Sequence, residues 1–473
     1  MSFIRYQKRG KQEYAYEITA YWDSHKKKPR QKSKYLGVVL DKEKKLFVKK
    51  TRLKSEKFIL DFGDTYAILE FLRKKKLTYL LRQIFKDKTQ YLLTLICYRL
   101  CYPSAMRYAE TWYDGNIARL LFKDVDISSQ RISDFLNLIG DEGLQREFFK
   151  HYISLFTKPR KGIIIDTTAL PNQIHLPMSV WGFNDGEIDK QIRFLLIVDK
   201  NTSLPLFFRY LPGNIVDVSS LVTTMEELKK YGIEKSFIFV DAGFFSKENI
   251  KELYAKKIEF MTRLPATTKL YGRLVKEESR RIERFKHAVK YGKRVLFIKQ
   301  KIVNLFGKRL YVHIILDPER KGRETKKLLL EAIDKAYEED EKEIEYKLMK
   351  RGIMILVSSF KIKAEEVLPL YYLKQMVEKL FRFSKDDLKL IPLRVHRDET
   401  LRGYLFLLFI TLIVFVLLKK EVGKRFTVEE TLLTLRNLKC KVYDDEVIVQ
   451  ETNKQQKEIL EELKIIMPKK LGI

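Results

Sequence analysis

Two short apolar segments that each run into an aspartate constrain the fold of this chain more than any other feature. They are KGIIIDTTAL at residues 161–170 and KSFIFVDAGFF at residues 235–245. Runs of Ile, Phe and Val of this length are typical of buried β-strands. A carboxylate in such a run needs a partner, because burying an unpaired charge is costly. We therefore expect Asp166 and Asp241 to lie on neighbouring strands and to hold a divalent cation together.

The pattern around these two segments predicts an α/β domain. Alternating strand-like and helix-like periods indicate the order β-β-β-α-β-α-β. The expected strands cover residues 162–167, 192–199, 204–210, 236–241 and 258–262, and the expected helices cover 217–231 and 246–256. Strand-like runs between 266 and 318 and a charged helix over 322–349 then indicate an insertion. An apolar strand returns at residue 352, followed by helices over 364–390 and 401–418.

The two ends of the chain have other patterns. Residues 1–60 alternate polar with apolar positions and predict a small antiparallel sheet around the basic link SHKKKPRQK. Residues 61–157 have helical spacing with Lys and Arg on one side, which favours a DNA-binding region, although a packing domain fits equally well. The predicted division is therefore a β-rich basic module at 1–60, a helical region at 61–157, a catalytic core at 158–265 and 350–420, an insertion at 266–349, and a charged helical tail at 421–473.

Charge points to a polyanionic partner. The chain has 93 basic and 62 acidic residues, a formal net charge of +31, and such an excess favours DNA, RNA or an anionic membrane. The apolar run 404–418 has 15 residues, fewer than the ~20 that span a bilayer, so we expect a buried helix and no membrane partner. The three cysteines have no nearby His or second pair, which argues against zinc and favours a reducing, cytoplasmic setting.

A third carboxylate is expected on the helix over 364–390, because two-metal sites usually need more than two acids. On an ideal helix with about 100° per residue, Tyr371, Lys374, Glu378 and Lys385 lie within about 60° of one another. The opposite side is apolar and predicts a core face, made of Leu373, Met376, Val377, Leu380 and Phe383. One face of this helix therefore carries an acid for metal beside two cations for phosphate.

The other acids of this region fit the site less well, because they lie off this face, in the first turn of the helix or beyond its end. They are Asp386, Asp387, Glu365, Glu366 and Glu399. Taken alone, Glu378 is equally well explained by an ordinary ion pair, four residues apart, with Lys374 or Arg382.

Four motifs in order give the chain a family resemblance. They are IIIDTTAL, the stretch WGFNDGEIDKQIRFLLIVD, the turn LPGNIVDVSSL, and FIFVDAGFFSKENI followed by EFMTRLP. Together with the face of the helix, they resemble DDE transposases of the bacterial and archaeal insertion-sequence type. One subgroup of that family has the signature Tyr-x2-Arg-x3-Glu-x6-Lys. Here it reads Tyr371-x2-Lys374-x3-Glu378-x6-Lys385, with Lys in place of Arg, which keeps the charge and loses bidentate phosphate recognition.

The resemblance implies a fold and a mechanism. The fold would be a ribonuclease-H-like mixed sheet with flanking helices, interrupted by a β-rich insertion. Asp166, Asp241 and Glu378 would hold two Mg²⁺ ions, with Mn²⁺ as a possible substitute, for cleavage at transposon ends and strand transfer into target DNA. Tyr371, Lys374 and Lys385 would contact that DNA. The resemblance also implies a homodimer in a synaptic complex on terminal inverted repeats, in the cytoplasm of a prokaryote and near its nucleoid.

Two other functions share these features. A domesticated DDE nuclease would cut DNA without joining it, and a catalytically inactive DNA-binding protein would regulate transposition. The intact set of acids argues against the inactive protein and does not separate a nuclease from a transposase. Trp181 could stack on a DNA base, but we expect it to pack in the core.

Overall fold

The structure is a computed structural model. It describes residues 2–10, 12–23, 27–48, 58–156, 162–184, 187–214, 218–233, 237–240, 242–334, 341–391, 393, 395–423, 425–443 and 446–472. The chain forms two compact units. The first is Met1–Phe58 with Lys441–Ile448 and Gly472, and the second holds Ile59–Cys440, Val449–Leu471 and Ile473.

The N-terminal segment forms the expected antiparallel sheet. Its strands, in spatial order, are β1 (Ser2–Arg9), β2 (Gln12–Asp23), β3 (Lys28–Asp41) and β4 (Leu46–Val48). The expected basic link extends less far than predicted, because β3 already begins at Lys28. The sheet buries few side chains. Ala15 and Ile18 are buried, whereas Trp22 and Leu40 are exposed.

Residues 58–156 are helical after one short strand, β5 (Phe58–Asp61). The α-helices are α1 (Gly63–Lys74), α2 (Leu77–Phe85), α3 (Thr89–Cys101), α4 (Ala109–Asp114), α5 (Ala118–Leu121), α6 (Ser129–Ile139) and α7 (Glu142–Phe156). Their apolar faces belong to the main hydrophobic core of the protein. The predicted helical character of this region is confirmed.

The central sheet contains the first aspartate-bearing strand. It is antiparallel, with β8 (Glu187–Asp199) paired to β6 (Ile163–Pro171), to β7 (Val180–Asn184) and to β9 (Pro205–Pro212). After α8 (Val218–Lys230), the short strand β10 (Phe237–Val240) lies beside β6. The predicted strands and helices of this part are present, and β7 is an additional strand.

The insertion continues a sheet of the core. The order of this six-stranded sheet is β10-β11-β15-β14-β13-β12, with α9 (Lys247–Ala255) between its first two strands in the chain. Strand β15 (Ile353–Ser358) follows the insertion and pairs with both β11 (Glu259–Arg263) and β14 (Lys308–Leu316). The remaining inserted elements are α10 (Lys269–Glu278), β12 (Ala288–Tyr291), β13 (Arg294–Leu305), α11 (Pro318–Asp334) and α12 (Glu341–Lys350).

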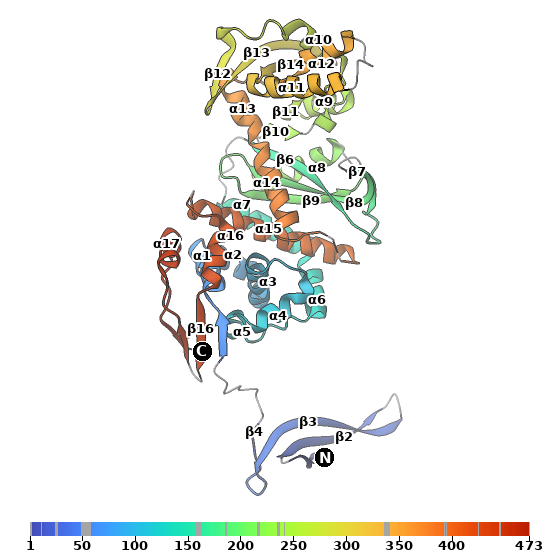
Figure 1. The fold of residues 1–473 in the computed structure, drawn as a ribbon. Helices are drawn as coiled ribbons and strands as arrows, with labels where there is room; N and C mark the ends of the chain where they lie inside the picture. The colour runs from blue at the N-terminus through green and yellow to red at the C-terminus, as the bar shows by residue number, and fades with distance from the viewer. Residues whose placement is uncertain are drawn as a thin grey trace. The chain divides into compact units, whose positions relative to one another are not determined.

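The helix expected over 364–390 is less regular than predicted. It consists of α13 (Ala364–Tyr372), α14 (Lys374–Arg382) and a π-helical turn, Phe383–Asp387. Leu373 between the two helices keeps helical dihedral angles, so they follow one another closely (Figure 1). The π turn bonds each residue to the fifth one before it, not the fourth. The ideal-helix angle that we predicted for Lys385 is therefore wrong.

The most apolar helix, α15 (Asp398–Glu421), lies in the core as expected. It is long and apolar enough to cross a membrane, but 89% of its apolar window is buried inside the protein. It packs against α3, α6 and β9. Its contact with α6 is backbone against backbone, because a Cβ built on Gly403 would lie 1.8 Å from the carbonyl oxygen of Leu136.

The C-terminal segment is mixed, so our prediction of a helical tail is wrong. Two helices, α16 (Val428–Arg436) and α17 (Lys454–Glu462), alternate with three short strands, β16 (Lys439–Tyr443), β17 (Glu446–Val449) and β18 (Lys470–Gly472). Burial in β16 and β17 alternates with a period of two, as in strands with one buried face. Each of these runs is only four or five residues long and lies between helical segments, which hides the period in the sequence.

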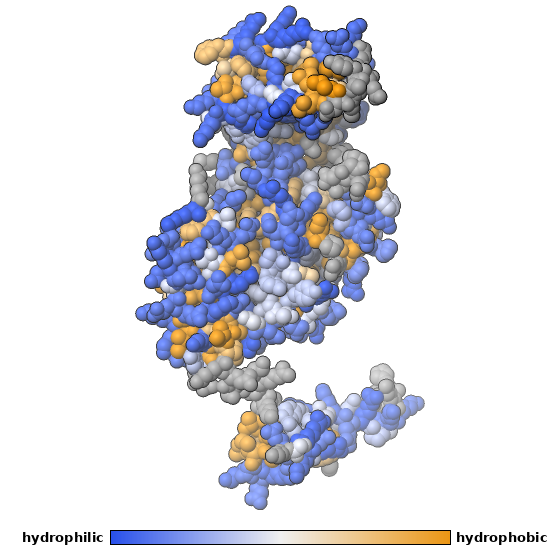
Figure 2. Space-filling view, in the orientation of Figure 1, coloured by the Kyte–Doolittle hydropathy of each residue, from blue (hydrophilic) through white to orange (hydrophobic). Residues whose placement is uncertain are grey.

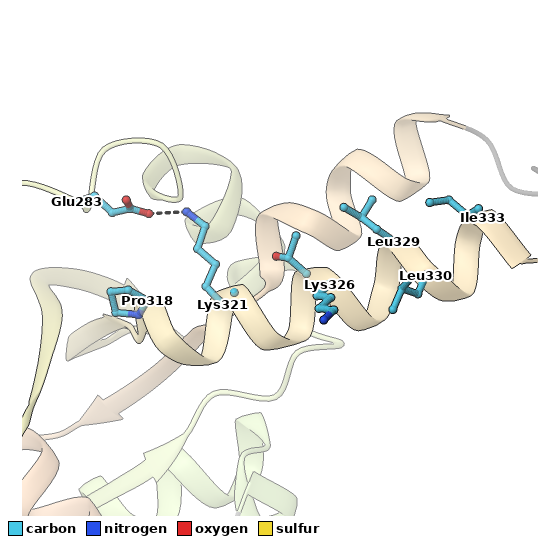
Figure 3. A pocket seen from close by; sticks show the side chains of 9 residues that line it. Glu283, Pro318, Lys321, Lys326, Leu329, Leu330 and Ile333 are labelled. Carbon is cyan, nitrogen blue, oxygen red and sulfur yellow. Dashed lines mark hydrogen bonds and ion pairs between the residues drawn. The ribbon is translucent and has the colours of Figure 1, made fainter.

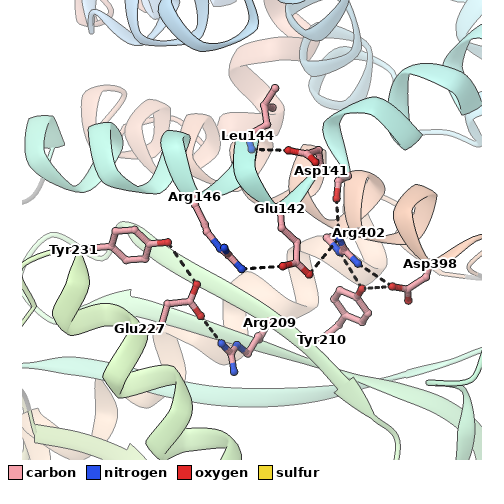
Figure 4. A network of polar contacts seen from close by, with 11 residues as sticks. Asp141, Glu142, Leu144, Arg146, Arg209, Tyr210, Glu227, Tyr231, Asp398 and Arg402 are labelled. Atoms are coloured by element: carbon pink, nitrogen blue, oxygen red, sulfur yellow. Dashed lines mark hydrogen bonds and ion pairs between the residues drawn. The ribbon is translucent and has the colours of Figure 1, made fainter.

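A polar network links α15 to the central sheet and the helical region (Figure 4). Arg402 of α15 donates to Tyr210 of β9 at 3.2 Å, to the carbonyl of Gly140 at 3.1 Å and to Asp398 at 3.0 Å. It also pairs with Glu142 at 3.3 Å. These contacts join three elements from distant parts of the sequence around one guanidinium group.

Candidate active site

Asp166 lies in the middle of β6, a strand with buried neighbours on both sides. Asp166 is paired with Leu196 of β8 in register, and β10 lies beside β6. The side chain is 8% exposed. Its Oδ1 accepts a hydrogen bond from the Thr167 amide at 3.0 Å. The carboxylate therefore stands in a largely dry place, where a nearby cation strongly lowers its free energy.

Lys374 brings a cation to this carboxylate. It is the first residue of α14, which packs on β6. Its Nζ lies 3.8 Å from Asp166 Oδ1, and the side chain is 14% exposed. The ion pair is thus formed between residues far apart in sequence and is mostly shielded from water.

Glu378 stands one turn further along α14. Its Oε1 also lies 3.8 Å from Lys374 Nζ, and its side chain is 55% exposed. Both carboxylates therefore share one ammonium group, and the two oxygens lie at most twice that distance apart. The ion pair between Glu378 and Lys374, four residues apart, that we considered is present. Lys374 is also paired with Asp166.

Asp241 lies outside the described residues, so its place relative to Asp166 and Glu378 stays a prediction. The described strand before it, β10, ends at Val240 and lies beside β6. Among the residues that the structure describes, no group of three or more His, Cys, Asp or Glu side chains is placed to hold a metal. Asp241 is not one of those residues.

The two other residues of the predicted face have different surroundings. The ring of Tyr371 is half-buried and packs edge-on to Tyr372, with centroids 5.7 Å apart. Tyr372 in turn stacks on Tyr291 of β12 at 5.2 Å. Lys385 is half-buried on the π-helical turn.

Trp181 does not pack in the core, so that prediction is wrong. Its side chain is 61% exposed at the edge strand β7, and the ammonium of Lys190 lies 6.0 Å from its ring centroid. On β8, Lys190 is directly opposite Trp181 in register. The contact with Lys190 on the neighbouring strand accounts for the exposed position of Trp181. The residues next to Trp181 in the sequence gave no indication of this contact.

Four pockets among the described residues are lined by neither Asp166 nor Glu378, although one of them is lined by Lys379, Leu380 and Arg382 of α14. One open pocket, of about 670 Å³, runs along α11 in the insertion (Figure 3). It is lined by Glu283, Pro318, Lys321, Gly322, Thr325, Lys326, Leu329, Leu330 and Ile333. The one acid there, Glu283, is ion-paired with Lys321. The surrounding surface is largely hydrophilic with separate apolar patches (Figure 2).

Sequence reasoning missed two buried polar residues, one in the insertion sheet and one in the helical region. His313 of β14 is buried among polar partners, and burial lowers its pKa to about 4. Arg99 of α3 is buried and donates to the carbonyl of Leu388, at the end of the π-helical turn. In the sequence, each is a single basic residue within an apolar run, and only this position indicates a buried polar role.

Comparison with known proteins identifies the family to which this mixed α/β chain belongs. The family model of the Transposase DDE domain matches residues 157–414, more than half of the chain. The chain therefore belongs to this transposase family, and the resemblance deduced from its motifs is confirmed at that level. The matched span holds Asp166, Asp241, Lys374 and Glu378.

No curated protein matches the chain. Among solved structures, it is similar to a chain described as "Cryo-EM structure of piggyBac transposase synaptic complex with hairpin DNA". The two are 13% identical, the match covers 79% of this chain and 70% of that one, and the TM-score is 0.37.

Proposed function

We propose that this protein is a DNA transposase that cleaves DNA at transposon ends and joins those ends to target DNA. The observation that carries the proposal is the meeting of Asp166 and Glu378 at Lys374, inside the span that matches the transposase family. The two acids come from separate elements, β6 and α14, so their approach is a product of the fold. A ribonuclease-H-like core accounts for the antiparallel strands β9, β8 and β6 with β10 beside β6.

The donor set suits a hard divalent cation. Asp166 and Glu378 present carboxylate oxygens, which Mg²⁺ and Mn²⁺ prefer, and their shared ammonium is already a cation between them. We propose that these two residues and Asp241 hold two Mg²⁺ ions. When bound, the ions would activate the attacking oxygen and stabilise the leaving oxygen of a phosphodiester.

Lys374 has two roles in this proposal. Without metal it compensates the buried charge of Asp166, because an unpaired carboxylate there would be costly. With metal and DNA bound, Lys374 would instead turn toward a phosphate near the scissile bond. Tyr371 and Lys385 would contact the same DNA. Lysine in place of the subgroup's arginine supports a point-charge contact in preference to a bidentate one.

The partners follow from charge and family. A net charge of +31 supports binding to double-stranded DNA at the terminal inverted repeats and at the target. A homodimer would pair two ends in one synaptic complex, and the protein would act in the cytoplasm, at the nucleoid.

Cleavage by the purified full chain tests the proposal. The substrate is labelled duplex DNA carrying the flanks of its own gene, with and without Mg²⁺. Asp166→Asn, Asp241→Asn and Glu378→Gln should each lower cleavage at least about 100-fold, since even groups that only support metal ligands cost 10–100-fold. Their affinity for DNA should stay the same. Full activity of any of the three would remove that residue from the site.

Glu365→Gln is the matched control, because Glu365 is an exposed acid in the first turn of α13, on the same helical segment. It should cleave like the wild type. DNA binding should weaken steeply with salt, as phosphate contacts do. Cleavage without joining would favour the domesticated nuclease, and binding without cleavage the inactive regulator.

A further inference from the structure

A row of hydrogen bonds centred on a buried histidine crosses the insertion sheet and ends at the segment that leads to Glu378. Its centre is His313 of β14, which is 1% exposed. Gln300 of β13 lies opposite His313 in register, and its Nε2 is 2.9 Å from His313 Nδ1. On the other side, Ser358 at the end of β15 places its Oγ 2.9 Å from His313 Nε2.

Ser358 and Gln300 each also donate a hydrogen bond to a residue outside the sheet. Ser358 Oγ donates to the carbonyl of Phe360 at 2.7 Å. Gln300 Nε2 donates to the carbonyl of Ile362 at 2.8 Å. Two carbonyls in the short connection between β15 and α13 are therefore held by side chains of the insertion sheet.

The direction of every bond follows from the donors. An amide NH2 only donates, so His313 Nδ1 accepts from Gln300. The hydroxyl proton of Ser358 goes to Phe360, so its oxygen accepts from His313 Nε2–H. This requires the neutral imidazole, and burial lowers the pKa of His313 to about 4, which keeps it neutral near pH 7. Both ring nitrogens of His313 and the Ser358 hydroxyl therefore have partners, and a satisfied polar network favours one arrangement.

The same connection is held from a second strand. The Ser359 amide donates to the carbonyl of Phe260 at 3.0 Å, and the Phe260 amide donates to Ser359 Oγ at 2.9 Å. Helix α13 begins five residues later, at Ala364, and α14 follows with Lys374 and Glu378. From Ala364 to Glu378 is about 21 Å of helix at ~1.5 Å per residue.

We propose that Gln300, His313 and Ser358 are positioning residues that set where Glu378 and Lys374 stand relative to Asp166. The connection 359–363 precedes α13, and α14 follows α13 closely, so a displacement of the connection should shift Lys374 and Glu378 as well. This rests on the proposed function and goes beyond it, since it assigns a task to the insertion. Displacements of about 1 Å can cost 10²-fold in rate, so hydrogen bonds well away from the acids affect the chemistry.

Two variants each remove one member of the network and both of its hydrogen bonds, and a third serves as a matched control. Ser358→Ala leaves His313 Nε2–H without its acceptor, and Gln300→Met removes the donor to Ile362. Tyr271→Phe is the control, because Tyr271 also donates one buried hydrogen bond to β15, at Ile353, 3.3 Å away. That bond is at the opposite end of the strand from the connection. Ser358→Thr keeps the hydroxyl and should restore wild-type behaviour.

The first measurement is the Mg²⁺ concentration that gives half-maximal cleavage. Ser358→Ala and Gln300→Met should raise it about 10-fold and lower the rate at saturating DNA 10- to 100-fold, as loss of supporting contacts does at metal sites. DNA affinity should change less than threefold. If both variants match Tyr271→Phe in Mg²⁺ requirement while their thermal midpoints fall equally, the network is structural only and the proposal is wrong.

The second measurement needs no catalysis. Amide hydrogen exchange in α13 and α14 should become faster in Ser358→Ala and Gln300→Met and stay unchanged in Tyr271→Phe. Unchanged exchange in all three variants would overturn the positioning role even in an active enzyme. A wild-type protein that never cuts DNA would instead overturn the proposed function, and exchange would still decide the positioning role. Gln300 is exposed, so Gln300→Met should fold if Ser358→Ala does not.

Discussion

The ammonium group of Lys374 lies 3.8 Å from the carboxylate of Asp166. The same nitrogen is 3.8 Å from Glu378. The lysine is thus a protein-borne cation at the point where the proposed mechanism needs metal ions. Without metal, the charge of Lys374 should therefore stabilise the folded protein. Substitution of the lysine tests this.

Lys374→Met should make the protein depend on Mg²⁺ for stability. Without the ammonium, the buried Asp166 carboxylate loses the cation that compensates its charge, which should cost about 1–3 kcal/mol. A bound divalent cation would then supply the missing charge, so added Mg²⁺ should raise the thermal midpoint more in this variant than in the wild type. Differential scanning calorimetry with Mg²⁺ and with EDTA measures the difference.

Lys379→Met, on the exposed side of the same helix, is the control for this experiment and should respond to Mg²⁺ like the wild type. Lys374→Arg should also do so, because it keeps a cation in place. If Mg²⁺ raises the thermal midpoints of Lys374→Met and the wild type equally, Mg²⁺ does not replace the charge of the lysine at this site.

Stability should rise with pH between about 4 and 6.5 because of His313. Its folded pKa of about 4 is below the ordinary value of 6.5, so the unfolded chain binds more protons in this window. The contribution of His313 to the free energy of unfolding is complete above pH 6.5 and is lost as the pH falls toward 4. It amounts to about 3 kcal/mol at most. Urea unfolding of the wild type and of His313→Gln at several pH values measures this contribution.

The exposed His175 provides the control for this measurement. His175→Gln should keep the wild-type slope of stability against pH in this window, and His313→Gln should flatten it. A slope unchanged in His313→Gln would assign the pH dependence to other groups.

Arg99→Met should destabilise the protein by at least about 2 kcal/mol. The buried guanidinium donates to the carbonyls of Leu388 and Ser104, the latter at 3.1 Å, and loss of a donor to a buried carbonyl costs 1–3 kcal/mol. Arg73→Ala removes an exposed arginine whose partner is three residues away, and it should change stability by less than about 0.5 kcal/mol. Chemical denaturation of both variants compares them. Similar values would show that the buried arginine is dispensable.

Two glycine substitutions should have opposite effects. Gly403→Ala would put a Cβ 1.8 Å from the Leu136 carbonyl oxygen, so α15 and α6 must separate, at a cost of more than about 2 kcal/mol. Gly322 lies in α11 with nothing within 4 Å of its built Cβ. Gly322→Ala should therefore stabilise the protein by about 0.5–1 kcal/mol through helix propensity. Thermal midpoints measure both, and a tolerated Gly403→Ala would contradict the close backbone contact.

Local patterns were sufficient for most elements. The strand holding Asp166, the helices α8 and α9, and the buried helix α15 were predicted from periods of two or 3.6 residues and from runs of apolar residues. Those patterns depend on neighbours in the chain. The strands of the C-terminal segment were missed because each is only three to five residues long.

The amino-acid sequence by itself determined the family, the two aspartate-bearing segments and the acid on a helix far downstream, because these depend on residue type and spacing. Only the tertiary structure decided that Lys374 stands between Asp166 and Glu378, that the insertion extends the core sheet through β15, and that His313 ties that sheet to the connection before α13. Each of these is a contact between segments far apart in sequence. Such contacts depend on how the elements pack, and periodicity within one segment carries no record of that packing.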